Sequence, residues 1–275
     1  MGRIDLHLHT TYSDGTWTPE ALVADAAARG VTLIAVTDHD DIGGIAPARA
    51  AGATLGVRVL SGVEINTEVG REQIHILGYG FPPEAPALRD ALAALRHARL
   101  VRLRAMLGRL AALGYPLDEA RVLAIAGHGS AGRPHLARAL AEAGHVAAPR
   151  EAFDRLIGNR GPAYVPRAPY RPEAAVALIH QAGGIASLAH PGKLGDPVRI
   201  INMLADAGLD ALEAYHSDHA PAVTARMLRY AAHFRLLVTG GTDSHGPDGP
   251  RVVPVGAVAV PDAVGDRLLR VLERI

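Results

Sequence analysis

Hydrophobic and polar residues follow one another along the chain in a pattern that predicts short strands separated by helices. Residues 4–9 alternate between apolar and polar with a period of two, and residues 32–38 form a short apolar run typical of a buried strand. Between them, Thr18 and Pro19 form a helix start with an N-cap hydroxyl, and Gly30 ends that helix. The same criteria predict further strands over residues 57–65, 73–78, 185–189, 211–215, 236–240 and 255–260.

The order of these segments predicts an α/β fold. Helices are predicted over residues 44–53 and 263–274 and between the later strands. Repeated strand–helix units with buried strands favour a parallel sheet. Some seven units, most of them short, fit a closed barrel better than an open sheet. We therefore expect an irregular (β/α)7 barrel of the TIM-like kind.

The middle of the chain has a different pattern, which predicts a helical insertion. Residues 87–113 repeat leucines with a period near 3.6, and shorter helical patterns cover residues 117–126 and 134–143. We therefore expect a barrel formed by residues 1–84 and 171–275, with residues 85–170 inserted as a small helical domain over one rim.

Charge is distributed unevenly between these two parts. Residues 85–170 hold 13 arginines and 6 acidic residues, a balance of +7, and the rest of the chain has a balance of −7. An acidic barrel beside a basic insertion suits a polyanionic substrate held over cations. The alternative is that the arginines form solvated helix faces.

Composition excludes several kinds of protein. The 275 residues include no cysteine, which excludes a disulfide scaffold, a thiolate zinc site, an iron–sulfur cluster and a cysteine nucleophile. The formal net charge is zero, which argues against a globally basic coat for nucleic acid. The sequence shows neither the apolar core of a signal peptide nor a run of about 20 apolar residues. We expect a cytoplasmic protein that neither enters a membrane nor needs an obligate protein partner.

Candidate metal ligands stand at the ends of the predicted strands. His7 and His9 lie two apart, so both imidazoles face the same side of their strand. His75 is flanked by two isoleucines and faces away from both. Because active sites of barrels lie at the carboxyl ends of the strands, we expect these side chains to converge. The whole set comprises His7, His9, Asp14, His39, Glu64, His75, His190, Asp243 and His245.

Six imidazoles and three carboxylates can hold two or three cations of the zinc, manganese or iron type. Only three carboxylates would leave such a site positive and able to attract phosphate. His216 and His219 follow another predicted strand at the same rim, so both are candidate substrate contacts, as is His128.

Several motifs resemble those of the PHP (polymerase and histidinol phosphatase) family. They include Asp-Leu-His-Leu-His-Thr at 5–10, Thr-Asp-His-Asp at 37–40, Ala-His-Pro-Gly at 189–192 and Gly-Thr-Asp-Ser-His-Gly at 241–246. The resemblance covers residues 1–83 and 171–260 and fills all nine ligand positions. The place of the insertion, with Gly-Arg-Pro-His at 132–135, is similar to the branch that contains the nucleoside 3',5'-bisphosphate phosphatase and a related 5'-to-3' exoribonuclease.

The resemblance implies a PHP barrel with three divalent metal ions, of manganese, iron or zinc. The first would bind His7, His9, Glu64 and Asp243; the second Glu64, His75 and His190; the third Asp14, His39 and His245.

The same resemblance implies catalytic roles for Glu64, Asp243 and His190 and substrate contacts from Arg133 and His135. Two positions depart from the family pattern. Ser244 replaces an aromatic residue, and Gly161 stands where a basic residue is expected, with Arg160 one place earlier as a candidate substrate contact.

These observations predict a metal-dependent phosphoric monoester hydrolase. The expected reaction removes the 3'-phosphate of a nucleoside 3',5'-bisphosphate, and the same centre could trim short 5'-phosphorylated RNA from its 5' end. The alternatives are a histidinol-phosphate phosphatase and, in a different class, a non-catalytic metal-binding module.

Overall fold

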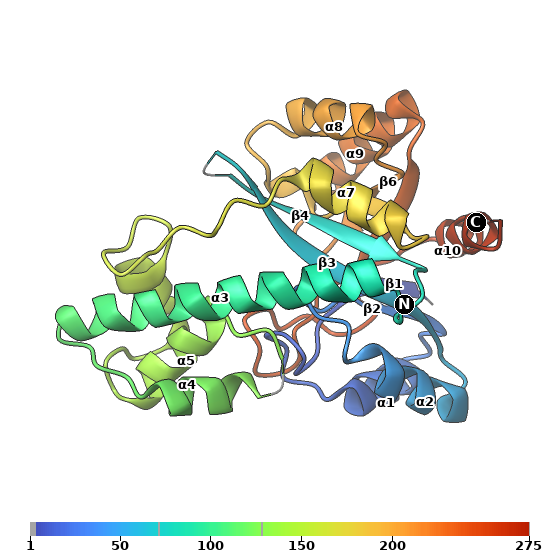
Figure 1. Cartoon of the computed structure of the whole chain (residues 1–275). Helices are drawn as coiled ribbons and strands as arrows, with labels where there is room; N and C mark the ends of the chain where they lie inside the picture. Colours follow the sequence, from blue (N-terminus) through green and yellow to red (C-terminus); the bar gives the residue numbers. More distant parts are fainter. Residues whose placement is uncertain (1–3, 71, 128, 275) are drawn as a thin grey trace.

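A computed structural model describes residues 4–70, 72–127 and 129–274. Seven strands form one sheet in sequence order. They are β1 (Ile4–Leu8), β2 (Leu33–Val36), β3 (Arg58–Val69), β4 (Glu72–Tyr79), β5 (Ile185–Leu188), β6 (Ala211–His216) and β7 (Leu237–Gly241). Backbone hydrogen bonds join β1 to the segment after β7, from His9 to Ser244 and from Asp243 to His7. The sheet is therefore nearly closed into the expected irregular barrel (Figure 1).

Strand β4 runs antiparallel to both of its neighbours, so the prediction of an all-parallel sheet is wrong at this point. Strands β3 and β4 pair continuously from Gly62 with Tyr79 to Val69 with Glu72. So short a connection permits only antiparallel pairing. The reversal places His75 opposite Asn66. His75 therefore lies at the same end of the barrel as the carboxyl ends of the parallel strands.

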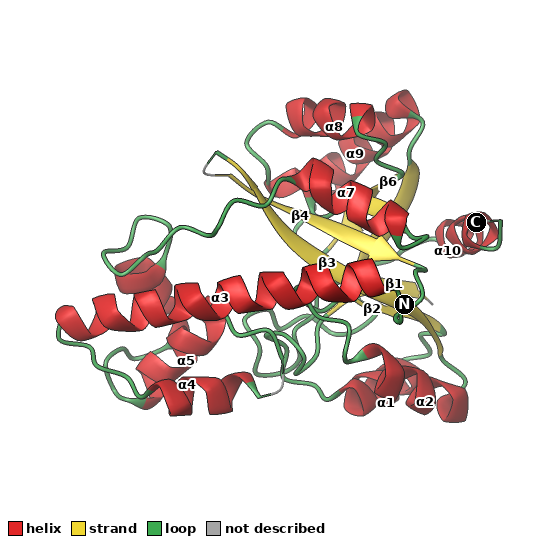
Figure 2. Ribbon diagram, viewed as in Figure 1, coloured by secondary structure: helices red, strands yellow, loops and turns green. Residues whose placement is uncertain are grey.

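Helices cover the outside of the barrel (Figure 2). They are α1 (Pro19–Ala28), α2 (Ile45–Leu55), α7 (Pro172–Gln181), α8 (Pro197–Asp206), α9 (Pro221–Phe234) and α10 (Asp262–Leu272), with a 3-10 turn η2 (Pro191–Lys193). The predicted start of α1 is confirmed, because the Thr18 hydroxyl oxygen accepts the N–H of Ala21 and Pro19 occupies the first turn.

The predicted strand over residues 255–260 is wrong. Val255 and Val260 are buried, but the segment between them is a loop. Gly256 has a φ of +71°, and it donates its N–H to the buried Asp5 carboxylate rather than to a neighbouring strand. The apolar pattern here reflects burial of a loop against the barrel.

The insertion consists of helices α3 (Pro86–Ala112), α4 (Glu119–Ala126), α5 (Arg133–Glu142) and α6 (Pro149–Ala152), followed by a π-helical turn η1 (Phe153–Ile157). These elements share a core of their own, which includes Leu103, Met106, Leu110, Leu136, Leu140 and Ile157. Helix α3 also belongs to the barrel, since Leu88 and Leu92 pack into the barrel core. The boundaries at residues 85 and 170 stay predictions.

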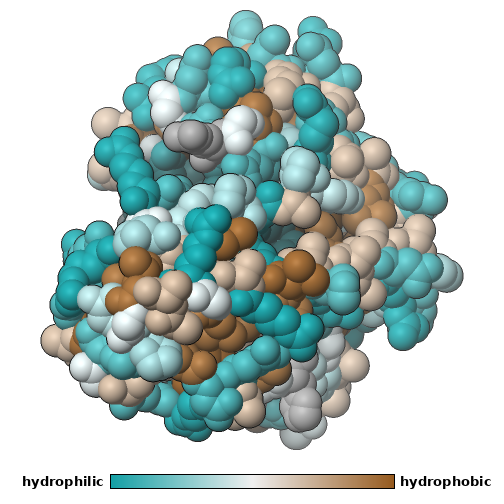
Figure 3. Space-filling view, turned by 60° about the vertical axis from the view of Figure 1, so that its left-hand side comes forward, coloured by the Kyte–Doolittle hydropathy of each residue, from teal (hydrophilic) through white to brown (hydrophobic). Residues whose placement is uncertain are grey.

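The face of the molecule that includes the insertion is shown in Figure 3. Hydrophilic residues are interspersed there with smaller groups of hydrophobic ones. Across the described parts of the chain, the large hydrophobic side chains that are exposed are far apart in the sequence: Leu55, Val101, Leu113, Val198 and Val252. Within the same ranges, none of the helices combines the length and the apolar character that crossing a bilayer would require.

Candidate metal centre

The nine predicted ligands come together at one end of the barrel. Strands β1, β3 and β4 carry His7, Glu64 and His75, and the segments after β5 and β7 carry the others from the second half of the chain. A cavity of about 470 Å³ is lined by seven of the nine. The other two, His7 and His9, contact the lining residues Glu64 and Asp243.

The spacing of four ligand atoms fits a bound cation. His9 Nε2 lies 3.3 Å from Glu64 Oε2 and 3.2 Å from Asp243 Oδ1. His7 Nε2 lies 3.4 Å from each of the same two oxygens. Ligands at about 2.1 Å from a metal in tetrahedral geometry are separated by about 3.4 Å. These side chains are therefore placed as ligands of one ion would be.

Two further groupings adjoin the first. Glu64 Oε1 lies 2.7 Å from His75 Nδ1 and 3.2 Å from His190 Nε2. Asp14 Oδ1 lies 3.3 Å from His245 Nε2 and 3.9 Å from His39 Nε2. His39 Nδ1 also approaches Glu64 Oε2 at 2.9 Å, a contact that the sequence did not predict. Glu64 thus touches members of all three groupings, and the division of ligands among individual ions stays a prediction.

Several buried ligand atoms have no hydrogen-bond partner. They are His7 Nε2, His9 Nε2, Asp14 Oδ1, Glu64 Oε2, His75 Nε2 and His190 Nδ1. Buried polar atoms in folded proteins are nearly always paired, so a cluster of unpaired ones needs a ligand. Imidazole nitrogens and carboxylate oxygens are ligands for divalent zinc, manganese and iron. The residues present therefore fit divalent metal ions.

The carboxylates of the cluster stay ionised. Burial alone would raise the pKa of Glu64, but the imidazoles of His39 and His75 lower it well below its usual range. Burial likewise opposes ionisation of Asp243, and His7 above all lowers its pKa well below the usual range. Both groups therefore offer anionic oxygens at neutral pH.

Two buried carboxylates that sequence reasoning missed hold the ligands in place. Glu213 Oε1 lies 2.9 Å from His7 Nδ1, and Glu213 Oε2 accepts the backbone N–H of His190 at 2.6 Å. Burial would raise the pKa of Glu213, but His7 and other imidazoles lower it to about 2. Asp38 accepts the hydroxyl of Ser13, whose oxygen lies 3.4 Å from His9 Nδ1. Glu213 had a sequence signal, an acid within an apolar strand.

The predicted substrate residues differ in their surroundings. Arg133 donates to Asn159 Oδ1 at 2.8 Å and to Gln73 Oε1 at 3.5 Å, and both partners line the metal cavity. Arg160 is exposed beside Asn159. His216 lies within the metal centre, where its Nε2 is 3.3 Å from Asp243 Oδ2. Substrate contact by these three residues stays a prediction.

Two of the predicted contact histidines are engaged with backbone groups. His135 Nδ1 accepts the N–H of Gly132, and the ring also bonds to the backbone of Ser13. His219 lies between Ala214 O and the N–H of Gly192, each bonded to one ring nitrogen. Both imidazoles thus brace loops beside the metal centre, and His128 lies outside the described residues.

A group of four arginines adjoins the metal centre: Arg99, Arg102, Arg133 and Arg167, here called the arginine cluster. Arg99 pairs with Asp40 at 2.5 Å. Three buried nitrogens of the cluster have no hydrogen-bond partner, namely Arg99 Nη2, Arg102 Nη2 and Arg167 Nε.

Burial, and then the neighbouring Arg99, lowers the pKa of Arg167 to about 9. Four cations near the two carboxylates of Asp40 and Glu68 leave the cluster positive. Asn66 connects the arginine cluster to the metal ligands. It lines a small cavity together with Arg99, Arg102 and Arg167, and its Nδ2 lies 3.0 Å from His39 Nδ1.

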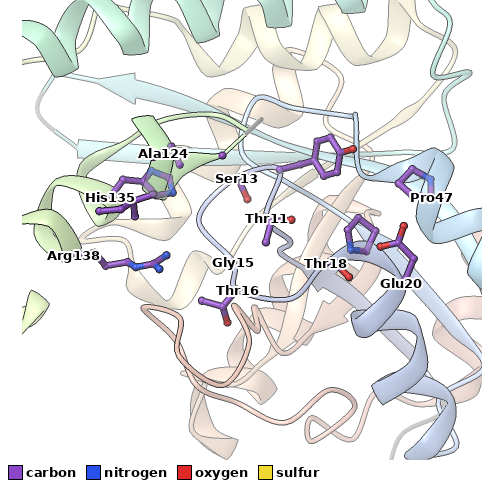
Figure 4. A pocket seen from close by; sticks show the side chains of 15 residues that line it. Thr11, Ser13, Gly15, Thr16, Thr18, Glu20, Pro47, Ala124, His135 and Arg138 are labelled. Atoms are coloured by element: carbon purple, nitrogen blue, oxygen red, sulfur yellow. The ribbon is translucent and has the colours of Figure 1, made fainter. Parts of the chain in front are cut away.

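A second cavity, of about 430 Å³, lies between the barrel and the insertion (Figure 4). Ser13 and Gly15, which flank Asp14, face it from the barrel, and His135 and Arg138 face it from α5. The loop that carries Asp14 therefore separates this cavity from the metal centre.

Comparison with known proteins agrees with the geometry. Residues 5–235 match the PHP domain. The chain belongs to the PHP domain family. Its barrel has the fold of that family, since the structure superposes on a protein from Bifidobacterium adolescentis described as a metal-dependent phosphoesterase. The TM-score is 0.86 at 32% identity, over 97% of this chain and 95% of the other.

The names of three curated relatives describe enzymes that act on phosphate esters. A phosphoribosyl 1,2-cyclic phosphate 1,2-diphosphodiesterase of Eggerthella lenta is 38% identical, over 92% of this chain and 97% of its own. A 3',5'-nucleoside bisphosphate phosphatase of Chromobacterium violaceum is 36% identical, over 90% and 88%. The 5'-3' exoribonuclease Rnm of Salmonella typhimurium is 34% identical, over 88% and 85%. This PHP protein is accordingly a hydrolase that acts on phosphate esters.

Proposed function

We propose that this protein removes the 3'-phosphate of a nucleoside 3',5'-bisphosphate and leaves a nucleoside 5'-monophosphate. The observation that carries the proposal is the arginine cluster beside the metal centre. Its unpaired, buried guanidinium nitrogens would donate hydrogen bonds to one phosphate while the metal centre acts on another. A substrate with two phosphate groups uses both places.

The reacting phosphate would lie in the metal cavity, above the nine ligands. Bound metal ions neutralise phosphate oxygens and lower the pKa of water to about 7, which supplies a nucleophile at neutral pH. Glu64, Asp243 and His190 would fix the geometry of the centre. Arg133 would reach a phosphate oxygen through two parallel donors, since its guanidinium already meets Gln73 and Asn159 on the cavity wall.

The other phosphate would act as a handle. Arg99, Arg102 and Arg167 would receive the 5'-phosphate, and binding energy there would orient the 3'-phosphate towards the metals. The 5'-terminal nucleotide of a phosphorylated RNA carries the same two groups. The same site would therefore trim short 5'-phosphorylated RNA and leave 5'-hydroxyl RNA almost untouched.

A second candidate substrate is phosphoribosyl 1,2-cyclic phosphate. The relative from Eggerthella lenta favours it, because the match covers 97% of that protein. This substrate also carries two phosphate groups, so it satisfies the same two-anion geometry without a base. Histidinol phosphate has one phosphate and would leave the arginine cluster empty, which is why it ranks behind both.

The decisive experiment compares kcat/KM for hydrolysis by the manganese-loaded enzyme, followed as phosphate release from the monoesters and as ring opening of the cyclic diester. The substrates are 3',5'-bisphosphoadenosine, 3'-AMP, 5'-AMP, phosphoribosyl 1,2-cyclic phosphate and histidinol phosphate, with chelator-treated enzyme as the control. One charge-assisted hydrogen bond to the handle is worth about 1.5–3 kcal/mol, so the bisphosphate should exceed 3'-AMP by at least about 10-fold.

Equal rates for 3'-AMP and the bisphosphate would overturn the two-anion proposal. A preference for the cyclic phosphate would select the second candidate, and a preference for histidinol phosphate would replace both.

A further inference from the structure

Glu213 lies on β6 with its side chain completely buried inside the barrel. Its two carboxylate oxygens serve two different donors. Oε1 lies 2.9 Å from His7 Nδ1, and Oε2 accepts the backbone N–H of His190 at 2.6 Å. One side chain thus joins ligands that come from β1 and from the segment after β5.

The contact with His7 determines which ring nitrogen carries the proton. A carboxylate accepts a hydrogen bond, so His7 donates from Nδ1, and Nε2 is the nitrogen whose lone pair would be available to a metal ion. That Nε2 has no hydrogen-bond partner and lies 3.4 Å from both Glu64 Oε2 and Asp243 Oδ1. The acceptor at Nδ1 therefore directs the free lone pair into the cluster.

The contact with His190 acts on the backbone. His190 has φ +31° and ψ +51°, a left-handed conformation that is unfavourable for a residue with a Cβ. The N–H of this residue is held by Glu213 rather than by a neighbouring strand. The turn that carries the His190 ring towards Glu64 thus depends on the second oxygen of the same carboxylate.

We propose that Glu213 is a positioning residue that sets the tautomer of His7 and the backbone of His190, and so couples two metal positions. The inference rests on the metal centre but not on the identity of the substrate. It does not require Glu213 itself to touch a metal ion or a phosphate.

The isosteric variant Glu213→Gln separates this role from simple packing. Glutamine has one oxygen and one NH₂ group where glutamate has two acceptors. The backbone N–H of His190 can only donate, so it would take the oxygen. The NH₂ group would then face His7 Nδ1 and force the proton to Nε2, where it blocks metal binding.

A matched control lies just before the same strand. Asp210 also accepts from an imidazole, His180 Nε2 at 2.7 Å, and from a backbone N–H, that of Ala186 at 2.8 Å. It has no contact with the nine ligands among the described residues. Asp210→Asn therefore makes the same chemical change away from the metal centre.

The test measures metal affinity and histidine tautomers without any substrate. Zinc affinity would be measured by competition with a chelator, and the loss expected for Glu213→Gln is about 10–100-fold at one position or more. Asp210→Asn should bind as the wild type does. Imidazole ¹⁵N NMR of the zinc-loaded protein should show His7 protonated at Nδ1 and bound to zinc through Nε2 in the wild type, and this pattern should be lost in Glu213→Gln.

Unchanged zinc affinity together with an unchanged His7 tautomer would overturn the proposal. If Glu213→Gln does not fold, the spectrum of the zinc-loaded wild type decides, because zinc bound through Nδ1 of His7 there contradicts the role assigned to Glu213. A wild-type protein that binds no metal would instead refute the metal centre.

Discussion

Arg102 offers a sharp test of the arginine cluster. Its Nε donates to Val165 O at 2.7 Å, and its Nη2 is buried without a partner. Burial, and then the neighbouring Arg133, lowers the pKa of Arg102 to about 10. Burying a cation beside another cation is energetically unfavourable, which suggests that Arg102 serves to bind an anion. Arg102→Met would keep most of the volume and remove the charge.

The expected effects on activity and on stability differ. Loss of one charge-assisted hydrogen bond, about 1.5–3 kcal/mol, lowers kcat/KM for the bisphosphate by about 10–150-fold. Activity on 3'-AMP should stay nearly constant, because that substrate has no second phosphate. The lost bond to Val165 and the relief of a buried, poorly compensated charge oppose each other. The free energy of unfolding should therefore change by less than about 1 kcal/mol.

The assay is phosphate release from both substrates, combined with denaturant unfolding and metal analysis. Arg104→Met is the matched control, since Arg104 lies two residues further along α3 and is exposed in a pair with Glu119. An equal loss on 3'-AMP and the bisphosphate would refute the assignment of a handle site. So would a stability loss above about 3 kcal/mol, which would indicate a structural role.

Three further results are expected. Glu64→Gln should remove more than one metal ion per chain by elemental analysis, because Glu64 touches all three groupings; loss of one or none would contradict its bridging role. Arg133→Ala should lower kcat/KM for the bisphosphate by about 10–200-fold at unchanged metal content. The control is Arg121→Ala, at an exposed arginine, and unaltered kinetics of Arg133→Ala would exclude Arg133 from substrate binding. In metal-free protein, burial lowers the pKa of His9, but the carboxylates of Asp243 and Glu64, 3.2 and 3.3 Å from its Nε2, raise it to about 10. The resulting stability is complete below about pH 6.5 and is lost as the pH rises towards 10, so the melting temperature should fall over that range, and a flat profile would contradict the pairing.

The metal centre was largely predictable because its signal is local. Each ligand stands on or just after a predicted strand, and barrel geometry brings strand ends together whatever the exact lengths of the strands. His75 lies beside the other predicted ligands, although the direction of β4 was wrong, because it faces the same layer in either case. The prediction of a strand over residues 255–260 failed because burial of a loop against the barrel also gives an apolar pattern like that of a strand.

Apart from Arg133, the arginine cluster had no comparable signal. Arg99 and Arg102 lie three apart on α3, a spacing that surface helices also show, and Arg167 follows some 65 residues later. Only tertiary packing brings them together. Glu213 was missed for a related reason: an acid in an apolar strand is visible in the sequence, but its two partners lie in other strand units.

Helix α3 has a consequence for how this molecule unfolds. Its first turns are fixed in the barrel core and its later turns in the core of the insertion, within one uninterrupted helix of 27 residues. Because a helix propagates order along its length, melting either core would withdraw support from the other. The slowest amide protons of both parts should therefore exchange with the same free energy, as expected of a single cooperative unit.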